Sequence, residues 1–319
     1  MKRRAFKLVV GAIAATTIVT SVSATDLSLF TTIYDTDFTA AGYGGMRGSG
    51  TGSISVSGVS GTVSHAYLFW HGPSNASTSQ APIANANVTF NGTDVTGSFL
   101  GISDNNCWGF ANSLAYRADV TSLITGNGNY SLSNFVKPNG IDVNGVSLIV
   151  FFKDGNSTNN RDVVMFNGND SNIENQFDAD GWNVTLAGIS YTSGAANAQF
   201  HVSDGQVFGD DAVIANGSAI APAGAVFQGD SVPGPNLPQG DGNLWDIKDF
   251  SVTSLLNPGL NTLSITSGVA GDCLSCVLIA IDLPAGAAPP PNGTPEPGSL
   301  ALLGGAMLAG FGARRIRRK

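Results

Sequence analysis

Strand-like segments recur along the middle of this chain, and helical periodicity is absent between Asp26 and Pro284. Short β-prone runs bounded by Gly, Asn, Asp and Ser are typical of strands joined by tight turns, so the sequence predicts an all-β fold. Two runs, HAYLFW and VSLIVFF, are apolar at consecutive positions, which predicts central strands covered on both faces. The expected strands are 53–59, 63–70, 86–90, 130–135, 146–152, 163–166, 184–191, 199–202, 211–215, 262–266 and 276–283.

A weak internal repeat organises these strands. The segment DVTSLI at 119–124, followed by NYSL at 129–132, resembles SVTSLL at 251–256, followed by NTLS at 261–264. In both copies an early strand, an Asn-Gly turn, a tryptophan and a closing hydrophobic strand stand in the same order around the motif. The order predicts two tandem related β-sandwich units, residues 25–172 and 173–284.

The N-terminus has the pattern of a signal peptide. Basic residues precede an apolar run from Leu8 to Val19, and the small residues Val22 and Ala24 stand three and one before the expected cut. The run is shorter than the ~20 residues of a spanning helix. We therefore expect signal peptidase to remove residues 1–24.

At the C-terminus, Pro295, Glu296 and Pro297 precede an apolar stretch from Leu300 to Ile316. A basic cluster ends the chain: Arg314, Arg315, Arg317, Arg318 and Lys319. This order resembles the PEP-CTERM sorting signal, here residues 294–319, after a Pro/Gly/Ala-rich linker at 285–293. The resemblance implies an exosortase as partner during export, with release to the cell surface or the extracellular matrix. The basic cluster should stay cytoplasmic, which predicts transient inner-membrane anchoring by a short helix.

The VTSLL signature, followed by Gly-x-Asn-x-Leu, resembles a segment of galactose-binding-like jelly rolls, including the non-catalytic sandwich domains of glycosidases. It is also similar to domains of unknown function that are joined to PEP-CTERM tails. The resemblance implies a jelly-roll-like fold for both units. It implies no ligand, because one fold serves many functions.

The body between the two termini is strongly acidic. It holds six of the 15 Lys and Arg residues but 22 of the 23 acidic ones, nearly all of them Asp. Such a surface repels phosphate backbones, so nucleic acid is not an expected partner.

The chain has three cysteines, Cys107, Cys273 and Cys276. In an oxidising exported setting one pair is expected to form a disulfide, and Cys273 with Cys276 is the candidate pair. A strand-like run follows this CxxC instead of a helix, which disfavours a thioredoxin-like site.

Recognisable catalytic chemistry is missing from the sequence. There are three histidines, His65, His71 and His201, and no GxSxG or HExxH motif. Structural strand positions are the favoured interpretation of all three. A glycosidase could use two aspartates, but the sequence does not single out a pair.

Calcium is the best candidate ligand, because hard cations prefer clustered carboxylate and carbonyl oxygens in loops. Asp154 and Asn156 present oxygens at alternate positions, and Asp210 and Asp211 belong to a second acidic group. All four could equally be solvated turn residues. The loop tryptophans Trp108, Trp182 and Trp245 could stack on sugars if exposed, or close the sandwich if buried.

The leading hypothesis is a non-enzymatic surface or matrix protein associated with exopolysaccharide in a biofilm, with no required cofactor. One alternative is a calcium-dependent carbohydrate-binding module of the lectin type. Another is a polysaccharide-active hydrolase.

Overall fold

The structure is a computed structural model that describes residues 26–235 and 242–288. Over these ranges the chain forms β-strands throughout, and its one α-helix, α1 (Ala81–Ala84), has four residues. The prediction of an all-β fold is therefore confirmed.

The strands are, in chain order, β1 (Ser28–Tyr43), β2 (Gly52–Val56), β3 (Thr62–Ser74), β4 (Asn87–Phe90), β5 (Thr93–Thr96), β6 (Ser98–Ser103), β7 (Asn112–Asp119), β8 (Gly128–Ser133), β9 (Gly145–Lys153), β10 (Arg161–Ser171), β11 (Asn183–Tyr191), β12 (Asn197–Ser203), β13 (Val213–Ala215), β14 (Ser218–Ala221), β15 (Trp245–Ser251), β16 (Gly259–Thr266) and β17 (Ser275–Pro284). Two 3-10 turns, η1 (Thr121–Leu123) and η3 (Thr253–Leu255), interrupt them.

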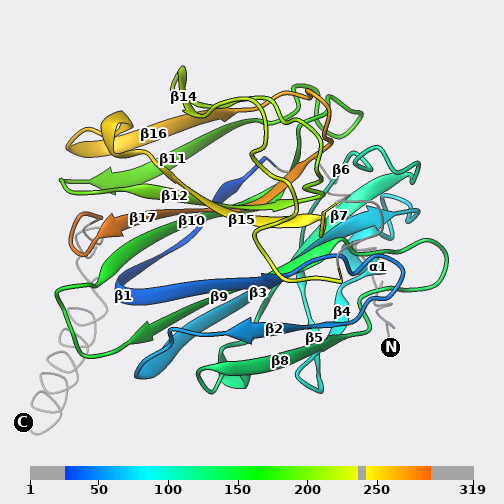
Figure 1. The fold of residues 1–319 in the computed structure, drawn as a ribbon, viewed down its shortest axis with the longest axis horizontal. Coiled ribbons are helices and arrows are strands. Elements are labelled where there is room, and N and C mark those ends of the chain that lie inside the picture. Colours follow the sequence, from blue (N-terminus) through cyan, green and yellow to red (C-terminus); the bar gives the residue numbers. More distant parts are fainter. Residues whose placement is uncertain (1–25, 236–241, 289–319) are drawn as a thin grey trace, which may run out of the picture.

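Three sheets make up the fold of the described residues. The largest has nine strands in the order β15-β12-β17-β10-β1-β9-β3-β7-β6, and the others are β11-β16-β13-β14 and β2-β8-β4-β5. In Figure 1 the sheet with β11 and β16 lies at the top and the sheet with β2 and β8 at the bottom, with the nine-stranded sheet between them.

Strand β1 joins the two halves of the nine-stranded sheet. Its first part, 28–36, pairs with β10, and its second part, 37–43, pairs with β9. The register shifts between Ile33 and Thr36, where Asp35 has a φ of 49°. A shift of this kind bends a strand and exchanges the faces of its side chains. Strand β1 was not predicted from the sequence, because its polar residues and this irregularity hide the alternation of apolar and polar side chains.

Three apolar clusters fill the layers. The upper core lies between β11, β16 and the β10-β17-β12 half of the large sheet, and the lower core between β2, β8, β4 and the β9-β3-β7 half. The middle core takes residues from both halves, among them Phe69, Phe151, Met165 and Ala280. The large sheet is thus bent so that its two halves pack against each other.

The two apolar runs singled out in the sequence are central strands. In β3, Leu68 and Trp70 point into the lower core and Tyr67 and Phe69 into the middle core. Strand β9 lies between β1 and β3 and divides its side chains in the same way. Both faces are covered, as the unbroken hydrophobicity predicted.

The repeated VTSL motif forms the same turn in both copies. Thr121 Oγ1 accepts a hydrogen bond from the backbone N–H of Ala66 at 2.8 Å, and Thr253 Oγ1 accepts one from Ala196 at 2.8 Å. η1 therefore ties β7 back to β3, and η3 ties β15 back to β12.

The predicted division into units at 172/173 separates strands that pair with each other. Strand β10 ends at Ser171, yet it pairs along most of its length with β17. The two halves also share β1, so they are joined through one continuous sheet.

The cysteine pairing predicted from the CxxC spacing is wrong. Cys107 forms the disulfide with Cys273, and Cys276 is a free, buried thiol. Cys276 lies in β17, and its side chain points into the upper core, which keeps it from the disulfide.

The first residues of the predicted linker are held against the body. The backbone N–H groups of Gly286 and Ala288 donate to Asp162 Oδ2 at 2.7 and 3.0 Å. The predicted signal peptide and sorting signal lie outside the described residues. Within those residues, no helix has the length and hydrophobicity needed to cross a membrane.

Candidate ligand-binding site

A pocket of about 340 Å³ lies at one end of the β11-β16-β13-β14 sheet. Three strands meet there, because Thr266 at the end of β16 pairs with Asn183 of β11 on one side and with Ile214 of β13 on the other. The segments that precede β11 and β13 and follow β16 supply the remaining walls. Loop side chains are thus brought together on a rigid sheet edge.

Trp182 forms the inner wall of the pocket. Its ring packs against Phe200 and Phe227 of the upper core, with centroids 6.0 Å apart in both cases. Its backbone carbonyl accepts a hydrogen bond from the N–H of Ser267 at 3.0 Å. The indole is almost wholly buried, so it anchors the wall and offers no face for stacking on a ligand.

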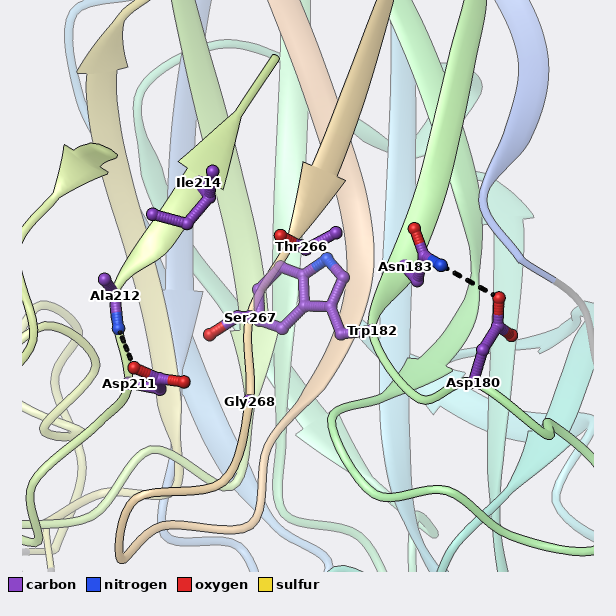
Figure 2. Close-up of a pocket in the computed structure, with 9 residues that line it drawn as sticks. All are labelled: Asp180, Trp182, Asn183, Asp211, Ala212, Ile214, Thr266, Ser267 and Gly268. Carbon is purple, nitrogen blue, oxygen red and sulfur yellow. Dashed lines mark hydrogen bonds between the residues drawn. The ribbon is translucent and has the colours of Figure 1, made fainter. Parts of the chain in front are cut away.

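Two exposed carboxylates stand at opposite sides of the pocket, as Figure 2 shows. Asp211 Oδ1 accepts a hydrogen bond from the N–H of Ala212 at 2.7 Å, and Asp180 Oδ2 accepts one from Asn183 Nδ2 at 3.0 Å. A Cβ atom at Gly268 would lie 2.5 Å from Asp211 Oδ2, so glycine at this position leaves room for the carboxylate.

Two buried polar atoms of pocket residues have no hydrogen-bond partner. They are Trp182 Nε1, a donor, and Ser267 Oγ, which can donate and accept. Buried polar groups are normally satisfied, so such atoms beside a pocket point to a missing ligand or water. Carboxylates, hydroxyls and an amide around one hollow suit a ligand with many hydroxyl groups.

Of the predicted calcium candidates, Asp154 and Asn156 lie in the exposed loop after β9. Asp154 Oδ1 accepts from the N–H of Asn156 at 2.7 Å, and Asn156 Oδ1 accepts from the N–H of Thr158 at 3.2 Å. The loop uses the alternate oxygens for its own turns. Calcium binding there stays a prediction.

The other two candidates have separate roles although they are adjacent in sequence. Asp210 is buried, and its Oδ2 accepts from the N–H groups of Val226 and Phe227 at 2.9 and 2.7 Å. Burial raises the pKa of Asp210. Asp211 points instead to the pocket. Within the described ranges, no three His, Cys, Asp or Glu side chains are grouped to hold a metal ion.

His71 and His201 lie where the two halves of the nine-stranded sheet meet, and each is hydrogen-bonded to a serine hydroxyl. His71 Nδ1 lies 2.7 Å from Ser203 Oγ, and His201 Nδ1 lies 2.8 Å from Ser147 Oγ. Burial lowers the pKa of both imidazoles to about 3, so they are neutral at physiological pH. These contacts join β3 to β12 and β12 to β9, which agrees with the structural interpretation of these histidines.

Trp108 differs from Trp182 and Trp245, which are buried. Trp108 is 36 % exposed, but the Arg47 guanidinium carbon lies 3.4 Å from the centre of its ring. Its indole N–H donates to both oxygens of the buried Asp204, at 2.9 and 2.8 Å. One face of the ring is therefore occupied by an arginine of the same chain.

The sequence missed two features of this region. Arg47 NH2 lies 3.5 Å from Asp204 Oδ1, an ion pair whose members are 157 residues apart and carry no common motif. Asp170 is buried in β10, four residues beyond the end of the predicted strand 163–166, and no sequence signal set it apart from the other aspartates. The predicted processing residues Ala24, Pro295, Glu296 and Pro297, and the terminal basic cluster, fall outside the described residues.

A comparison with solved structures found several matches, among them a chain described as "Structure of PNGF-II in C2 space group", with 12% identity and a TM-score of 0.29. The match covers 73% of this chain and 59% of that chain, so our chain spans less than two thirds of the other protein. A comparison with curated proteins found no match.

Family models match both parts of the chain. Residues 294–318 match the PEP-CTERM protein-sorting motif, which confirms the resemblance and indicates an exported protein processed by an exosortase. Residues 41–281 match the model described as "Protein of unknown function (DUF3344)" and cover nearly all of the described body. The chain therefore belongs to the DUF3344 family and carries a PEP-CTERM sorting motif.

Proposed function

We propose that this chain is a non-enzymatic surface or matrix protein that binds exopolysaccharide in the pocket between Asp180 and Asp211. The observation that carries the proposal is the pocket of Figure 2, where two exposed carboxylates flank buried polar atoms that lack partners. Carboxylates and side-chain amides are suitable partners for sugar hydroxyls, because a carboxylate accepts hydrogen bonds and an amide both accepts and donates them.

A non-enzymatic role fits the chemistry of the described residues. The two buried histidines bind serine hydroxyls in the interior, away from the pocket. Neither His71 nor His201 can therefore act as a base on a ligand between Asp180 and Asp211. Binding without turnover is the simpler use of such a site.

The test is co-sedimentation of the processed, exported protein with the producing organism's own exopolysaccharide. The double variant Asp180→Asn/Asp211→Asn should lower the bound fraction at least tenfold, since it removes both charged acceptors. A matched control is Asp94→Asn, which changes an exposed carboxylate on the opposite four-stranded sheet. Wild-type protein that stays in the supernatant would refute the proposal, as would equal binding by the double variant.

We further propose that the tail anchors the precursor in the inner membrane before release. The apolar stretch from Leu300 to Ile316 would be inserted, with the terminal basic cluster on the cytoplasmic side. Mass spectrometry of the released protein should then detect no peptide beyond the segment Pro295–Pro297. Released protein that retains Lys319 would contradict this order of events.

A further inference from the structure

Asp170 is an unusual carboxylate in this fold. It lies near the end of β10, opposite Cys276 of β17, and is 1 % exposed. Neither Oδ1 nor Oδ2 has a hydrogen-bond partner. An ionised carboxylate in that position has lost its water without receiving donors in exchange, which is a costly arrangement.

The other buried aspartates of the described ranges do not share this property. Each accepts at least one hydrogen bond from a backbone or side-chain N–H group: Asp37, Asp162, Asp178, Asp204, Asp210, Asp246 and Asp272. The fold therefore supplies donors to its buried carboxylates as a rule, and Asp170 is the exception that needs a partner of another kind.

A second carboxylate lies against the first. Asp178 is 5 % exposed, and its side chain interacts directly with that of Asp170. Its Oδ1 accepts from the N–H of Asp180 at 3.3 Å, whereas its Oδ2 has no partner. The carboxylates of Asp26 and Asp180 add further negative charge to Asp170. Burial and these neighbours raise the pKa of Asp170 well above its usual range.

Like charges in contact below the surface need either a shared proton or a cation. A shared proton serves two oxygens, the one that carries it and the one that accepts it, but three carboxylate oxygens lack partners here: both of Asp170 and Oδ2 of Asp178. A hard divalent cation can be coordinated by all three oxygens at once, because such ions bind several carboxylate oxygens. It also offsets the charge of the two further aspartates, which one proton would not do.

We propose that Asp170 and Asp178 anchor a calcium ion between β10 and the loop 172–182. Two carboxylates do not complete the coordination shell of calcium, so water and main-chain carbonyls supply its other ligands. Extracellular calcium modules of this modest charge have Kd values of about 10⁻⁴–10⁻³ M. The site does not depend on polysaccharide binding.

The loop that would be fixed by the ion leads directly to the pocket. It carries Asp178 and Asp180, and Trp182 follows before β11 begins. A bound cation would hold the backbone at Asp178 and thereby the position of Asp180 at the rim. Calcium would in this way order one side of the pocket without being part of it.

The test is thermal unfolding of the processed, exported protein after dialysis against chelator, with calcium chloride added alone and no polysaccharide present. At a calcium concentration about ten times Kd, the Tm of wild type should rise by roughly 3–5 °C. Asp170→Asn should abolish this rise. The metal-free variant should also melt above the metal-free wild type, because a buried charge has been removed.

Three further results decide the proposal. Asp178→Asn should likewise abolish the response, which keeps the test valid if Asp170→Asn does not fold. Asp154→Asn and Asp211→Asn should keep it, because those residues belong to the exposed loop and the pocket. Wild type that ignores calcium, or an Asp170→Asn variant that keeps the full shift, would overturn the proposal and favour a shared proton.

Discussion

The disulfide between Cys107 and Cys273 joins two residues that are 166 positions apart in sequence. Cys107 lies in the loop between β6 and β7 of one half, and Cys273 lies just before β17 of the other. The bond therefore links loops of the two halves. Nearby, Asn106 Nδ2 donates to the backbone carbonyl of Cys273 at 3.0 Å, so a hydrogen bond also holds the two loops together.

Removal of this disulfide should destabilise the protein. A cross-link that closes so long a loop limits the unfolded chain, and Cys107→Ser should lower the free energy of unfolding by about 2–5 kcal/mol. Urea denaturation measures the change. Reducing agent should lower the stability of wild type and of Cys276→Ala but leave Cys107→Ser unaffected. Equal stability of wild type and Cys107→Ser under oxidising conditions would contradict the prediction.

The buried ion pair should cost far more to break than an exposed one. Arg47→Met leaves the carboxylate of Asp204 without its cation in the interior, and we expect a loss of about 3–5 kcal/mol in the free energy of unfolding. Burial already raises the pKa of Asp204 well above its usual range, and Arg47 opposes that rise. The matched control is Lys153→Met, which breaks an exposed pair with Asp35 and should change stability far less. Similar losses in both variants would argue against the pair.

Both repeated threonines should contribute to stability. Thr121→Val and Thr253→Val each remove one acceptor from a backbone N–H, at Ala66 and at Ala196, and Thr253 Oγ1 also donates to the carbonyl of Ala196 at 3.1 Å. Loss of a partner for a buried N–H costs about 1–3 kcal/mol, so both variants should fall in this range, with Thr253→Val the more costly. Thr96→Val removes only an exposed hydrogen bond to Asn87 and should have little effect. A cost in one copy alone would show that the two turns are not equivalent.

Stability should fall as the pH rises through neutrality, and Asp272 should account for part of the fall. Burial raises its pKa from 3.8 to about 7 in the folded protein, with Asp210 and Asp246 adding repulsion. Between these values the native state holds the proton and the unfolded state does not, so the free energy of unfolding decreases with pH. The slope is at most about 1.4 kcal/mol per pH unit for one proton.

Asp272→Asn removes this contribution, and its stability curve between pH 5.5 and 8.5 should therefore be flatter than that of wild type. Asp178 and Asp246, with pKa values raised to about 6, act in the same direction and remain in the variant. His71 and His201 act oppositely, but only below about pH 6.5, because their pKa values are lowered. Guanidinium denaturation across the pH range measures the slopes. Parallel curves for the variant and wild type would refute the assignment.

The sequence by itself determined the class of the fold and many of its strands. Alternating and continuous apolar runs depend only on local burial, so β3 and β9 were predicted as central strands. The paired VTSL turns were visible because each is one contiguous segment of the sequence, whereas the bonds of their threonines to Ala66 and Ala196, 55 and 57 residues away, were not. The sorting motif is a contiguous signal and needs no tertiary structure to be identified.

Only the tertiary structure decided which distant residues meet. The bend of β1 at Asp35 folds the large sheet, and this fold brings Cys107 to Cys273 and Arg47 to Asp204. Spacing along the chain favoured Cys276 as the disulfide partner of Cys273, but the register of β17 points the Cys276 thiol into the upper core. The sequence likewise did not show that Asp170 is buried whereas many other aspartates are exposed to solvent. Burial and the supply of donors depend on packing from residues far away in the chain, which no local pattern records.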